Sequence, residues 1–200
     1  MRRLFEIGGY VAAVILLAIG IVALVLAFQS RSTVNNNLAA EKIVGTPDMT
    51  PTAIAAEAKK AGLNPANLPI PTQSVAGQAI TTGAKARVFA EYMRIHTLEA
   101  TGGREYSQMG RYLTASGKET NDPAQAAKDA NGQPKANAAR DIWVTYTALT
   151  TALNQAYFGT QVALLTIVIG VALIIAGIGF GILAFAAFRW IPKQEATAAT

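Results

Sequence analysis

Two long stretches without a charged residue lie near the ends of the chain, at 7–28 and 162–188, and a more polar segment lies between them. At a rise of about 1.5 Å per residue, a helix formed by either stretch can cross a hydrocarbon core about 30 Å thick. A helix of a soluble protein keeps a polar face, and the second stretch, which has neither charge nor proline, lacks one. The pattern therefore predicts two membrane-spanning helices.

The first stretch has a second interpretation, as a cleaved signal peptide. A signal peptide has a shorter apolar region and ends at a cleavage site of small residues. The apolar region is too long here, and the sequence AFQSR at its exit is a poor cleavage site. We therefore favour an uncleaved span. The expected division is 1–28, cytoplasmic N-terminus and first transmembrane helix; 29–159, extracytoplasmic helical domain; 160–190, second transmembrane helix; and 191–200, cytoplasmic tail.

Basic residues on the short sides of the two spans predict their orientation. Arg2 and Arg3 precede the first span, and Arg189 and Lys193 follow the second. Lysine and arginine close to a span favour the cytoplasmic side, whereas charges within a long loop count for little. The expected location is the cell membrane, with both termini in the cytoplasm and residues 29–159 outside.

Cap residues divide the middle segment into helices. Thr50, followed by a proline, is a good helix start, and Gly62 suits the left-handed position just past the end. Thr81 or Thr82 can cap a second helix over 84–100. The predicted fold class is therefore mostly α, with two transmembrane helices flanking an extracytoplasmic helical domain.

Three further helical segments are expected. The first span is expected to continue beyond the bilayer and to stop at Gly45, and an Asp-Pro pair favours a short helix over 122–130. From Asn137 the pattern is helical again and leads without a proline into the second span, which predicts one continuous helix. Its apolar stripe comprises Trp143, Tyr146, Leu149, Leu153 and Tyr157. We expect this stripe to pack against the helix at 84–100, on a face made of Val88, Phe89, Tyr92, Met93 and Ile95.

Composition narrows the chemistry that the chain can perform. It has no cysteine and one histidine, which excludes disulfides, thiolate zinc sites and any site built from two imidazoles of one chain. It has no phosphate-binding glycine loop, nucleophile elbow or metalloprotease helix motif. The net charge is +5, but the basic residues are scattered among acidic ones along the middle of the chain, so nucleic acid is not an expected partner. We predict a protein that is not an enzyme and that has no catalytic, cofactor-binding or metal site.

Four polar residues of the middle segment, Tyr92, His96, Arg104 and Arg111, are weak candidates for an interaction site. Histidine titrates near neutrality, which would suit a proton-linked role. A histidine that is hydrogen-bonded at the edge of a helix face is the more ordinary interpretation. The two arginines have tyrosines nearby and would suit lipid headgroups, a glycan or an acidic partner, although a solvated loop is again the more ordinary interpretation.

Small residues repeat every seven positions in both spans, and such repeats let transmembrane helices approach closely. They are Ala13, Gly20 and Ala27 in the first span and Ala163, Gly170, Gly177 and Ala184 in the second. Gly177 and Gly181 also form a small-xxx-small pair. Glycine and alanine are common in spans, but the matched spacing favours a packing seam.

Four stretches of the chain, MRRLFEIGGYVAAVILL, EKIVGTPDMTP, AKARVFAEYMRIHTLEATGG and ARDIWVTYTALTTALN, resemble a family of uncharacterised two-span actinobacterial membrane proteins. The resemblance covers most of the chain and implies a membrane location without an activity. Members of such families are sometimes labelled automatically as aromatic ring-opening dioxygenases. Non-haem iron oxygenases typically use two histidines and a carboxylate, so the single histidine argues against that label.

The function expected from these observations is that of a non-enzymatic accessory or scaffold protein of the cell envelope, with an extracytoplasmic interaction domain. The alternative is an extracytoplasmic ligand-sensing module that works through a partner, because the cytoplasmic ends are too short for a signalling domain. A weaker third interpretation is a subunit of an enzyme whose active site lies elsewhere. The expected partners are the lipid bilayer and other membrane or envelope proteins, and a homo-oligomer is left open.

Overall fold

The computed structural model describes residues 2–190, with side chains described for 7–186, so the tail expected at 191–200 lies outside the described residues. The chain divides into two compact units. Unit 1 comprises Met1–Thr33 and Thr160–Thr200, and unit 2 comprises Val34–Gly159. The expected boundaries of the outer domain were 29 and 159.

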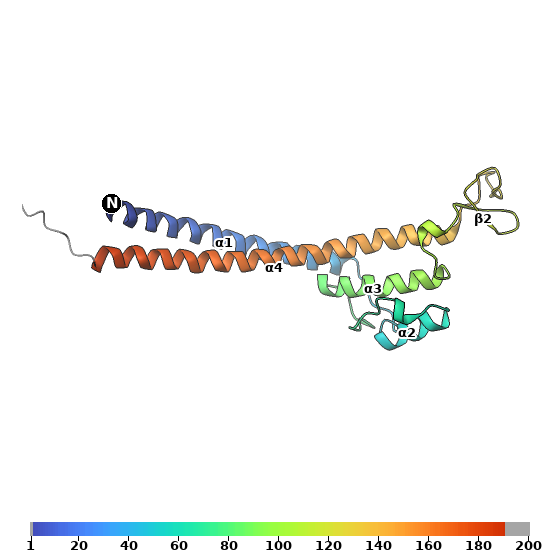
Figure 1. The fold of residues 1–200 in the computed structure, drawn as a ribbon, viewed down its shortest axis with the longest axis horizontal. Coiled ribbons are helices and arrows are strands. Elements are labelled where there is room, and N and C mark those ends of the chain that lie inside the picture. Colours follow the sequence, from blue (N-terminus) through green and yellow to red (C-terminus); the bar gives the residue numbers. More distant parts are fainter. Residues whose placement is uncertain (1, 191–200) are drawn as a thin grey trace, which may run out of the picture. The chain divides into compact units, whose positions relative to one another are not determined.

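The fold is mostly helical, and two of its helices are long and apolar enough to cross a membrane (Figure 1). The α-helices are α1 (Arg2–Ala40), α2 (Pro51–Lys60), α3 (Gly83–Ala100) and α4 (Ala138–Trp190). Two short 3-10 helices, η1 (Pro65–Asn67) and η2 (Tyr106–Gln108), and two short strands, β1 (Tyr112–Leu113) and β2 (Glu119–Thr120), lie in the connecting segments.

Helix α4 is continuous, which confirms the prediction that a helix starting near Asn137 runs on into the apolar stretch. The side-chain oxygen of Asn137 accepts a hydrogen bond from the backbone N–H of Ala139 at 3.1 Å and caps the first turn. Gly159 does not interrupt the helix. A glycine in a helix interior costs only about 1 kcal/mol, and the apolar residues that follow it outweigh that cost.

The predicted helix starts are confirmed for α2 and α3. Thr50 Oγ1 accepts a hydrogen bond from the N–H of Ala53 at 3.2 Å, and Thr82 Oγ1 accepts one from the N–H of Lys85 at 3.3 Å. Gly62 has a φ of 77°, the left-handed conformation expected just past a helix end. These starts and stops depend on local residues, which is why the sequence was sufficient to locate them.

Helix α1 ends at Ala40, not at Gly45 as predicted. A turn at 41–42 follows the helix, and Lys42 has a φ of 53°. Gly45 then donates its N–H to the carbonyl of Gln78 at 3.0 Å, so it pairs with a distant segment instead of continuing the helix. A side chain at Gly45 would overlap the carbonyl oxygen of Val75. The glycine is therefore required by a close approach of two loops.

The segment 122–130 does not form the short helix predicted for it. The N–H of Ala127 donates to the carbonyl of Leu113 at 2.9 Å, and the carbonyl of Ala127 accepts from Lys135 at 2.8 Å. Backbone groups that pair across the chain are not available for the bonds of a helix. The adjoining strands β1 and β2, which form a short antiparallel ladder, were not predicted either.

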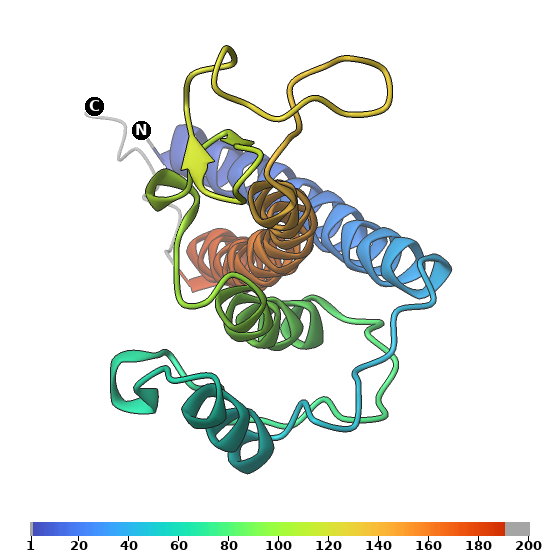
Figure 2. The ribbon, with the colours of Figure 1, turned by 90° about the vertical axis from the view of Figure 1, so that its right-hand side faces the viewer.

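In unit 2, helix α3 lies between α2 and the unit 2 part of α4 (Figures 1 and 2). This arrangement places the buried faces of the helices around one core. The core comprises Leu38, Met49, Ile54, Ala58, Val75, Ile80, Ala86, Phe89, Ala90, Tyr92, Ile95 and Leu153.

The stripe on α4 packs against α3, but Trp143 does so at a different place from the one predicted. Trp143 forms a second cluster with Leu98 and Met109, near the C-terminal end of α3. Leu149 and Leu153 pack against the main core. The difference arises because the indole N–H finds a buried partner there, donating to the carbonyl of Arg104 at 2.8 Å.

Candidate functional site

In unit 1, the buried positions among the described side chains are all alanine or glycine. They recur every seven residues on both helices, and a repeat of about 3.5 residues per turn is typical of helices that wrap closely around each other. These positions are the predicted seam, namely Ala13, Gly20, Ala27, Ala163, Gly170, Gly177 and Ala184.

The two glycines at the centre of this seam have no room for a side chain. A Cβ at Gly20 would lie 2.7 Å from Cγ1 of Ile174 and 2.8 Å from the carbonyl oxygen of Gly170. A Cβ at Gly177 would lie 2.9 Å from Cγ of Leu17. Gly181, the other member of the small-xxx-small pair, has more space, and its nearest neighbour, Cβ of Ala13, is 3.8 Å away from a Cβ placed there. The α1 and α4 segments of unit 1 therefore touch at backbone level around Gly20 and Gly177.

Many large apolar side chains are exposed on the outside of unit 1. Ile175 is 65% exposed, Leu183 is 68% exposed and Ile7 is 63% exposed. Only 17% of the most apolar window of each long helix is buried. Unit 1 thus presents an apolar surface around a narrow interior of small residues.

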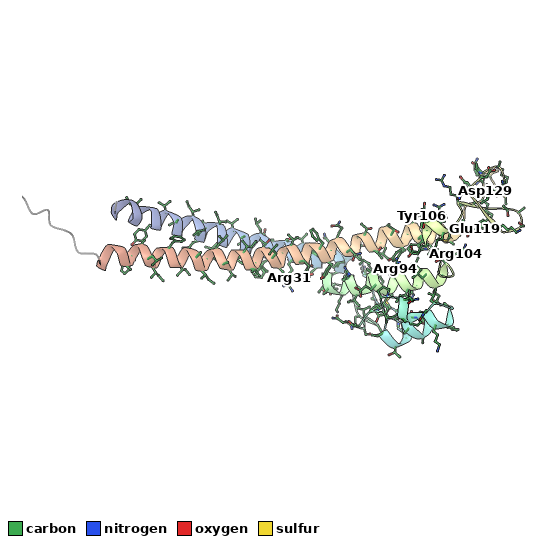
Figure 3. The ribbon with its side chains drawn as sticks, viewed as in Figure 1. Arg31, Arg94, Arg104, Tyr106, Glu119 and Asp129 are labelled. Atoms are coloured by element: carbon green, nitrogen blue, oxygen red, sulfur yellow. The ribbon has the colours of Figure 1, made fainter. Side chains whose placement is uncertain are left out.

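In unit 2, the carboxylate of Glu119 ties β2 to neighbouring segments. It accepts hydrogen bonds from the N–H of Gly110 at 2.9 Å and from Asn137 Nδ2 at 2.9 Å, and it pairs with Arg104 Nη1 at 2.7 Å. Figure 3 shows Arg104 and Glu119 close together. The hydrogen bond from the N–H of Gly110 lowers the pKa of Glu119 most, and burial opposes it; the Arg104 guanidinium and the Asn137 amide lower the pKa further, so that the net direction is downward. Arg104, one of the weak candidates, is therefore used in a structural ion pair.

The other arginine candidate lies in the same region. Arg111 is exposed, and its backbone carbonyl accepts from the N–H of Asn137 at 3.0 Å. Glu119 binds both the N–H of Gly110, next to Arg111, and the guanidinium of Arg104. The structure therefore brings the two arginine candidates into one loop region. The third, Tyr92, lies elsewhere.

Tyr92 is part of the core and does not belong to an interaction surface. Its side chain is 0% exposed, and its hydroxyl donates to the carbonyl of Gln73 at 2.9 Å. Burial, assisted by the charge of Glu91, raises the pKa of Tyr92. The hydroxyl is thus a neutral donor that anchors the loop before α3.

His96, the fourth candidate, lies beside two carboxylates that the sequence analysis did not single out. His96 Nε2 is 3.1 Å from Oδ2 of Asp48. Ligand atoms of Asp48, Glu57 and His96 all lie within 4.8 Å of one another. The three residues come from the turn before α2, from α2 and from α3, so no local spacing in the sequence pointed to the cluster.

A mainly apolar cavity of about 510 Å³ lies in unit 2, where the end of α1 meets α4. Leucines and other apolar residues line most of it, with Asn37, Glu41 and Gln155 adding polar groups. The apolar lining comprises Val34, Leu38, Ile43, Leu149, Ala152, Leu153 and Ala156. This volume lies in the range typical of small-molecule pockets, about 300–1,000 Å³.

The chain matches no family model, and no similar protein is found among curated proteins or solved structures. The family resemblance seen in the sequence therefore stays an expectation, and the function must be inferred from the residues themselves.

Proposed function

We propose that this protein is an integral membrane protein in which unit 1 crosses the bilayer twice and unit 2 forms an extracytoplasmic interaction domain. The observation that supports this most strongly is the composition of unit 1, where the buried residues among the described side chains are alanine and glycine and many large apolar side chains are exposed. Both termini would lie in the cytoplasm, because the short basic flanks favour that side.

A pair of membrane spans explains the long apolar helices better than the two alternatives, which are a buried core helix of a soluble protein and a helix pair in water. The core helix of a soluble protein would be mostly buried, whereas only 17% of each apolar window is buried. In water, exposed apolar surface costs roughly 25 cal/mol per Å², so the exposed residues of unit 1 would make it prone to aggregate. In lipid that cost disappears, and close backbone packing through small residues is what holds helices together.

The proposed role is that of a non-enzymatic accessory or scaffold protein of the cell envelope. Unit 2 has its own hydrophobic core, and its cavity beside Leu149 and Ala152 offers an apolar surface to a partner. The proposed partner is another membrane or envelope protein that inserts an apolar side chain or helix there. A resemblance to uncharacterised two-span actinobacterial membrane proteins would agree with this role.

The same cavity favours a second candidate function, an extracytoplasmic ligand-sensing module that acts through a partner. Its volume of about 510 Å³ and its mainly apolar lining suit a small apolar molecule. In this function the occupant of the cavity is a small molecule, whereas in the first it is part of another protein.

The experiment that separates the two functions is purification of the full chain from native membranes in a mild detergent, followed by mass spectrometry of what remains bound. Ala152→Trp fills the cavity, and Ala148→Trp, at another exposed alanine of α4, is the matched control. The accessory function predicts a protein partner that is lost in Ala152→Trp and kept in Ala148→Trp. A small molecule with the same dependence would support the sensor, and a chain that carries neither would contradict both.

A further inference from the structure

Three metal-ligating side chains converge in unit 2 from three different segments. Asp48 lies in the turn before α2, Glu57 lies on α2, and His96 lies on α3. One ligand atom from each lies within 4.8 Å of the other two. All three side chains are partly exposed, so the cluster is open to ions in solution.

The imidazole of His96 supplies the second observation. Its Nε2 atom is buried and has no hydrogen-bond partner, although the side chain as a whole is 28% exposed. The contact of 3.1 Å with Oδ2 of Asp48 is short, but it does not have the direction of a hydrogen bond. Buried polar atoms without a partner are rare in folded proteins, and an ion or a water molecule can account for such an atom.

We propose that Asp48, Glu57 and His96 bind one divalent transition-metal ion, for which Zn²⁺ is the probe. Zinc binds imidazole nitrogen and carboxylate oxygen at about 2.0–2.2 Å, so two of its ligand atoms lie roughly 3.0–3.5 Å apart. The observed 3.1 Å between Nε2 and Oδ2 fits this separation. When an imidazole nitrogen binds an ion, its lone pair points at the ion, and a second ligand atom lies to one side of that direction. Shared coordination therefore accounts for a short contact between Nε2 and Oδ2 that is not a hydrogen bond.

The donor set selects the class of ion. Imidazole nitrogen suits zinc and neighbouring transition metals, whereas calcium takes six to eight oxygen ligands and magnesium keeps several waters. Two carboxylates at this distance repel each other unless a cation lies between them. A dipositive ion would neutralise Asp48 and Glu57 and would use the buried nitrogen of His96, and water would occupy the open position.

The segments that carry the three ligands are held by the core, so the site is largely formed before an ion binds. Met49, next to Asp48, is 2% exposed, and its carbonyl accepts from the N–H of Val75 at 3.1 Å. Ile54 and Ala58 on α2 and Ile95 on α3 are each 0% exposed. A bound metal would tie the turn before α2, α2 and α3 together.

The test uses the full chain in detergent or nanodiscs, purified with a tag that contains no histidine and stripped with a chelator. Equilibrium dialysis and calorimetry with Zn²⁺ should show one bound ion per chain, weaker binding of Mn²⁺ and none of Ca²⁺ at the same concentration. His96→Gln and Asp48→Asn should each weaken Zn²⁺ binding by about 100-fold or more. Loss of a residue that only hydrogen-bonds to a metal ligand already lowers metal affinity by about 10–100-fold. Glu99→Gln, one turn from His96 on the same helix, is the control and should bind Zn²⁺ like the wild type.

X-ray absorption of the Zn²⁺-loaded wild type needs no variant, so it tests the inference even where a variant does not fold. It should show one imidazole among oxygen ligands. Absence of Zn²⁺ binding by the wild type would overturn the inference and leave a simple pair between His96 and Asp48. Equal losses in Glu99→Gln and His96→Gln would also overturn it, since they would point to diffuse surface charge. Neither result bears on the proposed membrane role, which rests on unit 1.

Discussion

The two units bury opposite kinds of side chain. In unit 2 the largest fully buried residues include Tyr92, Met49 and Ile54, as expected of a core formed in water. Among the described side chains of unit 1, the buried residues are alanine and glycine, while residues such as Ile175 and Leu183 are exposed. The difference is the one expected if, as proposed, unit 1 lies in lipid and unit 2 lies in water. Water drives large apolar groups inward, whereas in lipid these groups cost nothing outside and small residues allow close helix contact.

The same contrast separates two ways of holding helices together. Unit 2 combines apolar burial with directed bonds, such as the indole N–H of Trp143 to the carbonyl of Arg104 at 2.8 Å. In unit 1 the contacts at Gly20 and Gly177 are between backbone and aliphatic atoms. Substitutions should therefore affect the two units by different mechanisms, and a set of matched variants can test the distinction.

The largest effect is expected from removing the tryptophan side chain in unit 2. Trp143→Ala should destabilise unit 2 by about 3–5 kcal/mol, the usual cost of truncating a large buried aromatic residue. Protease sensitivity and hydrogen exchange of 84–113 should rise, while membrane insertion stays unchanged. Trp143→Phe keeps most of the volume and should be affected much less. A variant that stays as resistant as the wild type would show that this cluster does not hold unit 2 together.

A charge on the exterior should affect only unit 1. Ile175→Lys should lower insertion by roughly 2.5–3.5 kcal/mol, the cost of a lysine near the centre of a span. The control is Ile142→Lys, because Ile142 is 40% exposed on the unit 2 part of the same helix. Membrane fractionation measures both. If unit 1 were a water-exposed helix pair, Ile175→Lys would insert no worse than the control and would increase solubility.

A larger side chain at a glycine of the seam should separate the two helices of unit 1 without affecting membrane insertion. Gly177→Leu places a side chain where even a Cβ would lie 2.9 Å from Cγ of Leu17, and overpacking of this kind costs about 1–3 kcal/mol. Gly179→Leu is the matched control, since nothing lies within 4 Å of a Cβ at that position. Disulfide cross-linking between cysteines on the two spans should fall for Gly177→Leu alone. Equal cross-linking in both variants would mean that the seven-residue repeat is not a packing seam.

The smallest effect is expected from acid, and only in unit 2. The N–H of Gly110, followed by Arg104 and Asn137, lowers the pKa of Glu119 in the folded chain below its ordinary 4.5. The stabilisation is therefore complete above the ordinary pKa and is lost as the pH falls through the lowered value. Hydrogen exchange at 110–120, corrected for the intrinsic pH dependence, should show this loss, and Glu119→Gln should abolish it. A wild type and variant with the same pH profile would contradict the assignment.

The parts of this molecule that the sequence predicted well depend on neighbouring residues. The threonine caps of α2 and α3 and the continuity of α4 each follow from a few adjacent positions. The small residues at the seam positions are buried as well, and their period of seven is visible along one helix without knowledge of its partner; the seam itself stays a prediction.

The features that the sequence did not predict depend on distant segments. Asp122 looked like a helix cap, but the N–H of Ala127 pairs with Leu113, so the segment does not form a helix. Gly45 looked like a helix stop, but its role is set by Val75. The cluster of Asp48, Glu57 and His96 is the clearest case, since single residues from three segments carry no spacing that sequence analysis can recognise.

The most direct test of the central claim, that unit 1 spans the membrane and unit 2 lies outside, is the accessibility of single cysteines. The chain has no cysteine of its own, so an introduced one reports alone. Ser116 is exposed in unit 2, and Thr197 lies near the C-terminus, outside the described residues. In intact cells with any outer wall barrier opened, a membrane-impermeant thiol reagent should label Ser116→Cys, and it should label Thr197→Cys only after lysis. Labelling of Thr197→Cys alone would invert the proposed topology, and labelling of both variants in intact cells would contradict a two-span protein.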